Sequence, residues 1–80
     1  MNVAPNYNNG YINVNAEISE NSFYQLMVYD ASGKQVYSGE HYTESGMTED
    51  RVQVYSQATG IYIVKIVVNG QLMSDKVLWQ

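Results

Sequence analysis

The sequence predicts an all-β protein, a small Ig-like antiparallel β-sandwich of about six to seven strands with Greek-key connections. Three observations support this prediction. Valine, isoleucine and tyrosine are abundant while leucine is scarce, and the abundant residues are strand formers. Short segments alternate apolar and polar residues with a period of two, and turn residues separate these segments at short intervals. The helical period is found nowhere along the chain.

Residues 11–39 are predicted to hold the first three strands. Residues 11–18 alternate cleanly, and residues 23–30 follow after a polar turn with Tyr24, Leu26 and Val28 on one side. Residues 30–34 form a tight connection in which Asp30 bonds the backbone two residues on and Gly33 adopts a positive φ. Residues 35–39 form the third strand.

Residues 40–50 lose the alternation and are predicted to form a mobile loop centred on Gly46, with a short edge segment around Tyr42. This stretch holds four of the eight acidic residues. Alternation resumes in residues 51–56, where Val52 and Val54 are expected to point inward.

The C-terminal hairpin, within residues 59–80, is the best-defined element. Asn69-Gly70 between two apolar runs predicts a type I′ turn, because both residues tolerate a positive φ. A two-residue turn places Val64 opposite Asp75. A buried carboxylate without a partner is costly, so a bulge is expected near Ser74 and Asp75.

The first strand of this hairpin is apolar on both faces. Ile61, Ile63 and Val67 lie opposite to the face that carries Tyr62, Val64, Ile66 and Val68. One of the two faces must therefore be covered by the domain itself, by a second copy or by a partner.

The composition excludes several classes of protein. The 80 residues form a single domain, 1–80, in which residues 1–10 are interpreted as a linker and opening turn. Cysteine is absent, and four Lys and Arg residues in a chain of net charge −4 do not form a nucleic-acid interface. No apolar run is long enough for a transmembrane segment, and the N-terminus lacks the features of an export signal. We expect a domain excised from the C-terminus of a larger secreted protein.

Candidates for catalysis or metal binding are few. On a strand, the single histidine, His41, shares a face with Thr43 and not with Glu40 or Glu44, so no pair of histidine and carboxylate is expected. In a loop, Glu40, His41 and Glu44 could gather around a metal ion, although a solvated acidic loop is the favoured interpretation. An enzyme is not expected, nor is a cofactor.

Two other features have a structural and a binding interpretation. Asn6, Asn8 and Asn9 before Gly10 resemble a calcium loop without its carboxylates, so they are interpreted as turn residues. The eight tyrosines either form a ligand surface for sugars or peptides or, as favoured here, pack within the sheets.

Three blocks of the sequence resemble a known family. They are PNYNNGYINV (residues 5–14), VYDASGKQVY (residues 28–37) and TGIYIVKIVVNGQLMSDKVL (residues 59–78). In this order and spacing they resemble the type A C-terminal sorting domain of proteins exported by the type IX secretion system of Bacteroidetes. The resemblance covers nearly the whole chain.

The resemblance implies a fold and a function. Members of that family are seven-stranded Ig-like sandwiches at the C-terminus of secreted cargo. The outer-membrane translocon reads them as an address once the cargo is in the periplasm, and a sortase-like peptidase usually removes them while attaching the cargo to the cell surface. The implied localisation is therefore secreted or cell-surface, in a Gram-negative bacterium.

The resemblance also assigns the candidate recognition residues. Those matching the terminal strand, turn and closing strand are Gly60, Ile61, Tyr62, Val64, Lys65, Asn69, Gly70, Lys76 and Val77. Those matching the middle block are Asp30, Gly33 and Lys34. Turn geometry and core packing also explain the glycines and the apolar residues. Lys65 and Lys76 interrupt apolar strands, and they either contact a partner or provide solubility and edge protection.

Two departures from the family pattern stand out. The chain ends Leu78-Trp79-Gln80 where the family often has a basic residue, and its opening block has one proline where many members have two. An Ig-like adhesion or carbohydrate-binding module is the alternative function. Self-association through the terminal strands is a further expectation.

Overall fold

The computed structural model describes residues 1–54 and 57–80, and this part of the chain forms nine strands and no helix. All strand pairs are antiparallel, in three sheets. One sheet has the order β1 (Asn2–Asn6), β2 (Tyr11–Asn15), β7 (Asp50–Gln53). The largest has the order β5 (Gln35–Thr43), β4 (Ser22–Tyr29), β8 (Gly60–Val68), β9 (Gln71–Trp79). The third pairs β3 (Glu17–Ile18) with β6 (Gly46–Met47).

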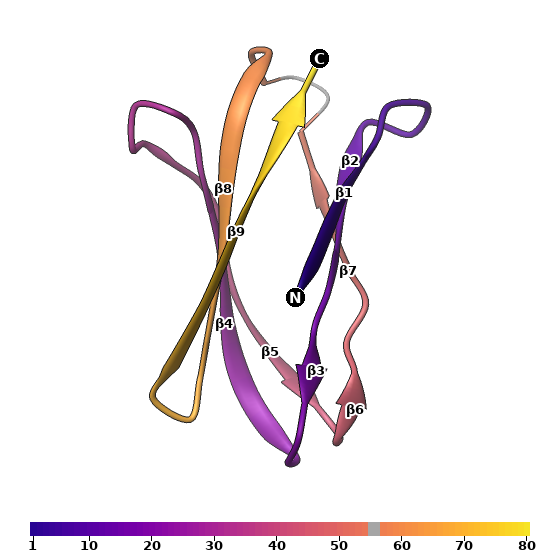
Figure 1. Cartoon of the computed structure of the whole chain (residues 1–80), viewed down its shortest axis with the longest axis vertical. Helices are drawn as coiled ribbons and strands as arrows, with labels where there is room; N and C mark the ends of the chain where they lie inside the picture. Colours follow the sequence, from indigo (N-terminus) through magenta and orange to yellow (C-terminus); the bar gives the residue numbers. More distant parts are fainter. Residues whose placement is uncertain (55–56) are drawn as a thin grey trace.

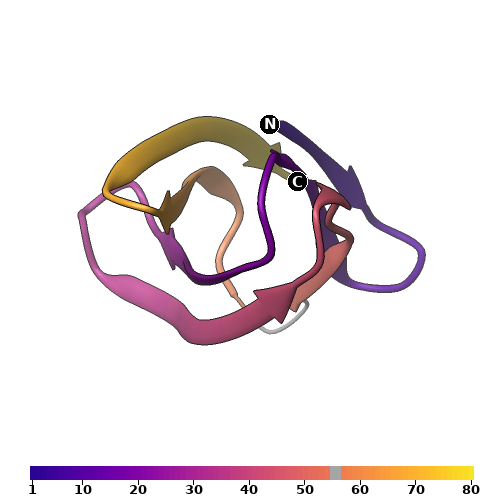
Figure 2. The same cartoon turned by 90° about the horizontal axis from the view of Figure 1, so that it is seen from below.

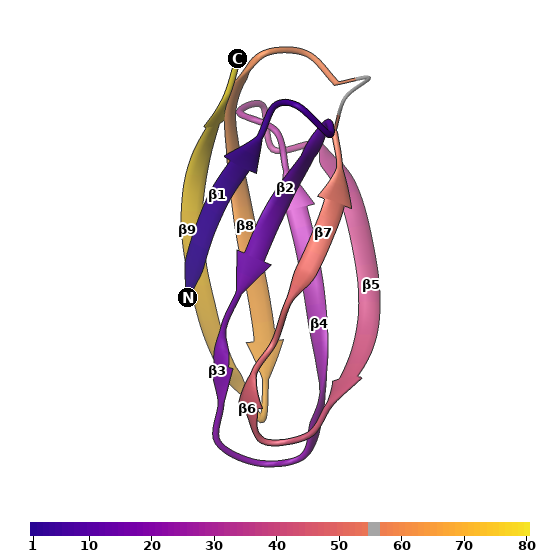
Figure 3. The ribbon, with the colours of Figure 1, turned by 90° about the vertical axis from the view of Figure 1, so that its right-hand side faces the viewer.

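The three- and four-stranded sheets form two layers around one core (Figures 1, 2 and 3). Alternate residues of the strands point into it, as the alternation predicts: Ile12, Val14, Ala16, Ile18, Tyr24, Leu26, Val28, Val52, Val54, Tyr62, Val64, Ile66, Val68, Val77 and Trp79 are all buried. The prediction of an all-β fold is confirmed. Tyr55 and Ser56, in the predicted strand 51–56, lie outside the described residues. No helix in the described part is suited to crossing a membrane.

The interpretation of residues 1–10 as a linker and turn is wrong for the first part, because Asn2–Asn6 forms β1 and pairs with β2. Proline and asparagine disfavour strands, but β1 is the edge of its sheet, where proline is tolerated. The turn itself spans residues 7–10. The Asn9 amide donates to the Asn6 side chain over 3.2 Å, the local bonding expected of turn asparagines.

The predicted loop over residues 40–50 is also wrong for most of its length, whereas the short edge segment expected around Tyr42 is confirmed within β5. β5 continues to Thr43, and β6 and β7 follow within the same stretch. Partners in β4 explain this extension, since Tyr42 lies opposite Phe23 with ring centroids 5.0 Å apart. An edge strand with one solvated side needs no regular alternation of apolar residues, so the sequence pattern indicated only a short segment around Tyr42 and not its continuity with β5.

The C-terminal hairpin has the predicted turn and register. Asn69 and Gly70 have φ of 50° and 75°, and Val64 lies opposite Asp75. The expected bulge is absent, because pairing runs unbroken from Gly60 with Trp79 to Val68 with Gln71. Asp75 is exposed, and on β9 burial appears only at Val77 and Trp79, in the strand that contacts β1. The carboxylate therefore never enters the core.

Gly70→Ala is expected to lower the free energy of unfolding by about 1 kcal/mol, because alanine is strained at a φ of 75°. A Cβ at this position would meet no atom within 4 Å, so the cost comes from the backbone alone. Urea denaturation measures it. Gln71→Ala, a substitution at the exposed residue next to the turn, is the control and should change stability by a few tenths of a kcal/mol at most. Equal effects of the two substitutions would contradict the prediction.

Candidate functional site

The predicted recognition residues do not form one patch. Some line a hollow at the end of the domain where β8 begins, some are buried in the core, and some lie on the outer face and the turn of the C-terminal hairpin. These places are described in turn, because each gives the residues a different role.

The middle and terminal blocks meet at the hollow, which measures about 230 Å³ and is lined by residues 30–32 and 57–62. Figure 1 shows the connection between β4 and β5 and the start of β8 at the same upper end of the domain. Asp30, Gly60, Ile61 and Tyr62 are thus brought together although two different motifs carry them.

The connection after β4 is built as predicted. One carboxylate oxygen of Asp30, Oδ1, accepts hydrogen bonds from the Ser32 amide (3.0 Å), the Ser32 hydroxyl (2.7 Å) and the Lys34 amide (3.0 Å). The bond from the Ser32 hydroxyl is the main reason that the pKa of Asp30 is lowered. Gly33 has a φ of 90°, as expected for this turn. The motif residues Asp30, Gly33 and Lys34 therefore shape the connection.

Tyr62, Val64 and Val77 are buried, so packing accounts for their place in the motif. The Tyr62 hydroxyl donates a hydrogen bond to the Ala58 carbonyl oxygen, which fixes the segment that leads into β8. Burial raises the pKa of Tyr62, with a smaller contribution from the charge of Asp30. Asn69 is also tied to the domain, since its side-chain amide donates to the Ser22 hydroxyl over 3.1 Å.

Lys65 and Lys76 lie on the outer face of the hairpin. The Lys65 ammonium is 5.1 Å from the centroid of the Tyr29 ring, a cation–π contact. Lys76 lies opposite Ile63 and is exposed. Neither lysine forms an ion pair within the described part of the chain. Among the motif residues, these two are the charged side chains on the outer face of the hairpin.

The doubly apolar strand β8 keeps its second face open. Ile61 is 40% exposed and Val67 is 39% exposed. Their cross-strand partners Leu78 and Leu72 are exposed too. Within residues 1–54 and 57–80, the domain therefore does not cover this face.

Of the last three residues, Trp79 belongs to the core. Trp79 is buried, and its ring centroid lies 5.0 Å from that of Tyr7. The Tyr7 hydroxyl donates to the Leu78 carbonyl oxygen over 3.0 Å. The segment after β1 thus fastens the end of β9.

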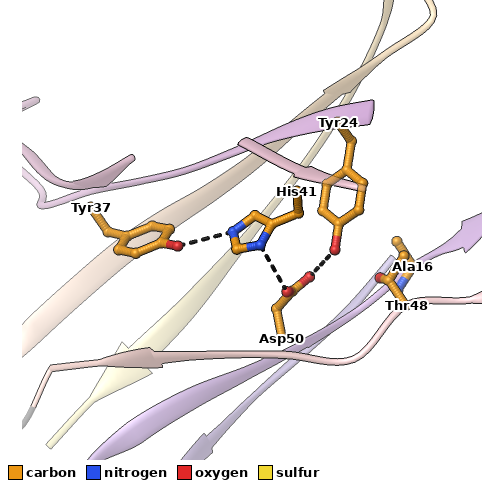
Figure 4. Close-up of polar contacts among 6 residues, drawn as sticks. All are labelled: Ala16, Tyr24, Tyr37, His41, Thr48 and Asp50. Carbon is orange, nitrogen blue, oxygen red and sulfur yellow. Dashed lines mark hydrogen bonds and ion pairs between the residues drawn. The ribbon is translucent and has the colours of Figure 1, made fainter. Parts of the chain in front are cut away.

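A polar cluster between the sheets was not predicted, because His41 was expected to have no carboxylate partner. In Figure 4, His41 Nδ1 lies 3.8 Å from Asp50 Oδ1, and its Nε2 lies 2.9 Å from the Tyr37 hydroxyl. The Tyr24 hydroxyl donates to Asp50 Oδ2 over 2.6 Å, and its ring stacks on His41. Asp50 comes from β7, so the cluster joins the two layers.

Part of this cluster has a signal in the sequence. Tyr37, Gly39 and His41 alternate along β5 and share one face, and a Cβ on Gly39 would lie 2.6 Å from the Tyr37 hydroxyl oxygen. The glycine thus leaves room for the bond between Tyr37 and His41. Asp50 belongs to another sheet, and no local pattern reveals that approach.

The chemistry of the cluster is structural. Burial and the hydrogen bond to Asp50 raise the pKa of Tyr24, so this tyrosine stays a neutral hydrogen-bond donor. Glu40 lies on the face of β5 opposite to His41, so the metal site considered for residues 40–44 is not formed. The cluster binds one layer of the domain to the other.

A comparison with known protein families identifies the family of this domain. Residues 2–80 match the secretion system C-terminal sorting domain. The chain belongs to this family. It is a sorting domain of the type IX secretion system that directs the secretion of an attached cargo protein, and it is not catalytic. The comparisons with curated proteins and with solved structures give no match.

Family membership also indicates which machinery the sorting domain interacts with and where its cargo is delivered. It implies an interaction with the type IX secretion machinery and a cargo that is secreted or displayed on the cell surface in Bacteroidetes. The resemblance inferred from the three sequence blocks is confirmed.

Proposed function

We propose that the outer-membrane translocon recognises this sorting domain through the exposed outer face of its C-terminal hairpin. The observation that carries the proposal is the presence of two lysines, Lys65 and Lys76, without ion-pair partners in the described chain, on an apolar face that the domain leaves open. Lys65 contacts the Tyr29 ring and Lys76 lies on an edge strand, but neither arrangement neutralises the charge, whereas a partner with a complementary acidic surface would.

The remaining motif residues support this surface from within. Tyr62, Val64 and Val77 pack the core beneath it, Asn69 and Gly70 fix its turn, and Gly60 and Ile61 continue it to the hollow. Asp30, Gly33 and Lys34 shape the neighbouring connection. These residues hold the hairpin in its shape and position, while Lys65 and Lys76 contact the translocon.

The wider proposal follows the family pattern. The cargo crosses the periplasm of a Gram-negative Bacteroidetes bacterium before recognition, and a sortase-like peptidase removes the domain at the surface. The two-layer arrangement of the described strands supports an Ig-like sandwich as its fold class. Self-association through the terminal strands remains a prediction that dilution in analytical ultracentrifugation would test.

Lys76→Glu should lower export of a reporter fused in front of residues 1–80 by about tenfold in a type IX-competent host, since charge reversal opposes a complementary surface. Surface and medium fractions are compared with the periplasmic fraction. Arg51→Glu is the matched control, because it makes the same charge change at an exposed residue of the other sheet. Normal export of a folded Lys76→Glu fusion would refute the role of this lysine.

A further inference from the structure

The outer face of the four-stranded sheet gathers most of the exposed large apolar side chains. In the described chain they are Phe23, Tyr42, Ile61, Val67, Leu72 and Leu78, with only Tyr7 and Met47 elsewhere. Cross-strand register places them in adjacent pairs: Phe23 with Tyr42, Val67 with Leu72, and Ile61 with Leu78. On the hairpin, Lys65, Ser74 and Lys76 lie between the two apolar pairs. A face that exposes this many large apolar side chains is typical of an interaction site.

The charge on the hairpin part of this face is opposite to that of the whole chain. The net charge is −4, yet Lys65 and Lys76 are the only charged residues among the outward-facing positions of β8 and β9. Glu40 shares the face but lies on β5, at the other edge of the sheet. The complement of this surface is therefore apolar and acidic.

Besides its exposed apolar side chains and its positive charge, the hairpin has a free edge along β9. In a hairpin with a two-residue turn, every second residue of β9 directs its backbone groups away from β8. Two of these groups have partners, since the Lys76 amide donates to Asp75 Oδ1 over 2.8 Å and the Leu78 carbonyl oxygen accepts from Tyr7. The corresponding backbone groups of Leu72 and Ser74 have none within the described chain.

This open stretch borders a hollow of about 280 Å³ lined by Ile63, Ser74, Asp75 and Lys76. The same short segment thus offers free backbone groups, an apolar side chain at Leu72 and a cation at Lys76. A lipid surface presents no hydrogen-bonding groups at the spacing of a strand, whereas an extended peptide does. The arrangement favours a protein partner over a membrane.

We infer that residues 72–76 bind an extended segment of a partner protein, which adds as a strand to the free edge of β9. The segment carries an apolar residue beside Leu72 and an acidic residue beside Lys76, on one face and separated by two or four positions. The inference rests on the proposed recognition through the hairpin and gives the chemistry of the partner.

A displayed library of random nonapeptides, panned on the purified domain, tests the inference. Enriched peptides should carry the apolar and acidic residues at the even spacing. Ser74→Pro removes an amide that faces away from β8, so the hairpin is kept and peptide affinity should fall about tenfold as the hydrogen bonds of strand addition are lost. Circular dichroism checks its fold. Lys76→Gln, an exposed substitution, should abolish the acidic preference and keep the apolar one.

Several outcomes would overturn the inference: no enrichment, enrichment without the acidic residue, or equal affinity for the unsubstituted domain and a folded Ser74→Pro variant. Binding to phosphatidylglycerol vesicles in place of peptides would assign the face to a membrane. If Lys76→Glu lowers export while no peptide is enriched, the translocon proposal stands and strand addition fails. If peptides are enriched as expected while Lys76→Glu is exported normally, strand addition stands and the translocon proposal fails.

Discussion

Trp79→Ala is expected to lower the free energy of unfolding by about 3 to 5 kcal/mol, the cost of removing a large aromatic side chain from a core. Trp79 is only 6% exposed, and it packs against Tyr7 at the end of β9. A domain of this size has a total stability near the lower end of about 5 to 15 kcal/mol. The variant should therefore be largely unfolded or close to it at 37 °C.

Leu78→Ala is the matched control for Trp79→Ala. Leu78 is the adjacent residue of β9, on the outer face, and is 44% exposed, so its truncation should cost about 1 kcal/mol or less. Urea unfolding is followed by circular dichroism, because Trp79 is the only tryptophan and its substitution removes the fluorescence signal. Similar losses in the two variants would show that Trp79 is not a core residue.

Trp79 joins the end of β9 to the segment after β1. Its ring packs against that of Tyr7, and the Tyr7 hydroxyl donates a hydrogen bond to the Leu78 carbonyl oxygen. An isolated sequence cannot show this, because the contact joins residues about seventy positions apart.

The sequence predicts the strands whose two sides differ in environment. β2 shows clear alternation because one side faces the core, β4 and β8 are rich in strand-forming residues, and the turn at Asn69-Gly70 determines the register of the hairpin. β1 and the second half of β5 are edge strands with polar sequences. They are stabilised by pairing with neighbours, a property that residue alternation does not encode.

The candidate site is predictable only where strand alternation determines which face a residue occupies. Strand alternation places Lys65 and Lys76 on the outer face, and the structure keeps them there. The hollow between the Asp30 connection and Gly60, and the approach of Asp50 to His41, both depend on how separate parts of the chain pack. The expected bulge at Asp75 failed because it assumed that all of β9 faces the core, whereas burial is confined to Val77 and Trp79.

The polar cluster between the layers is expected to make the stability of the domain decline at alkaline pH. The pKa of Tyr24 is raised in the folded state, first by burial and then by the hydrogen bond to Asp50. In the unfolded chain a tyrosine ionises near a pH of about 10. As the pH rises through that value, the unfolded state loses its proton first, so the stabilisation is complete below it and declines above it. Tyr62, whose pKa is also raised by burial, contributes in the same direction.

Tyr24→Phe should separate the effect of the hydrogen bond to Asp50 from the effect of ionisation of the Tyr24 hydroxyl. At neutral pH it is expected to cost about 1 to 3 kcal/mol, because Asp50 loses a donor in a partly buried site. Phenylalanine cannot ionise, so the stability of the variant should decline less steeply than that of the unsubstituted domain above a pH of about 10. The two curves therefore converge as the pH rises.

Urea denaturation at a series of pH values measures both effects of Tyr24→Phe. Tyr42→Phe is the control, since Tyr42 is 55% exposed and its substitution should leave the alkaline slope unchanged. An equally steep decline in Tyr24→Phe and in the unsubstituted domain would show that Tyr24 does not control the alkaline limit. A shallower decline would show that ionisation of Tyr24 contributes to the loss of stability at alkaline pH.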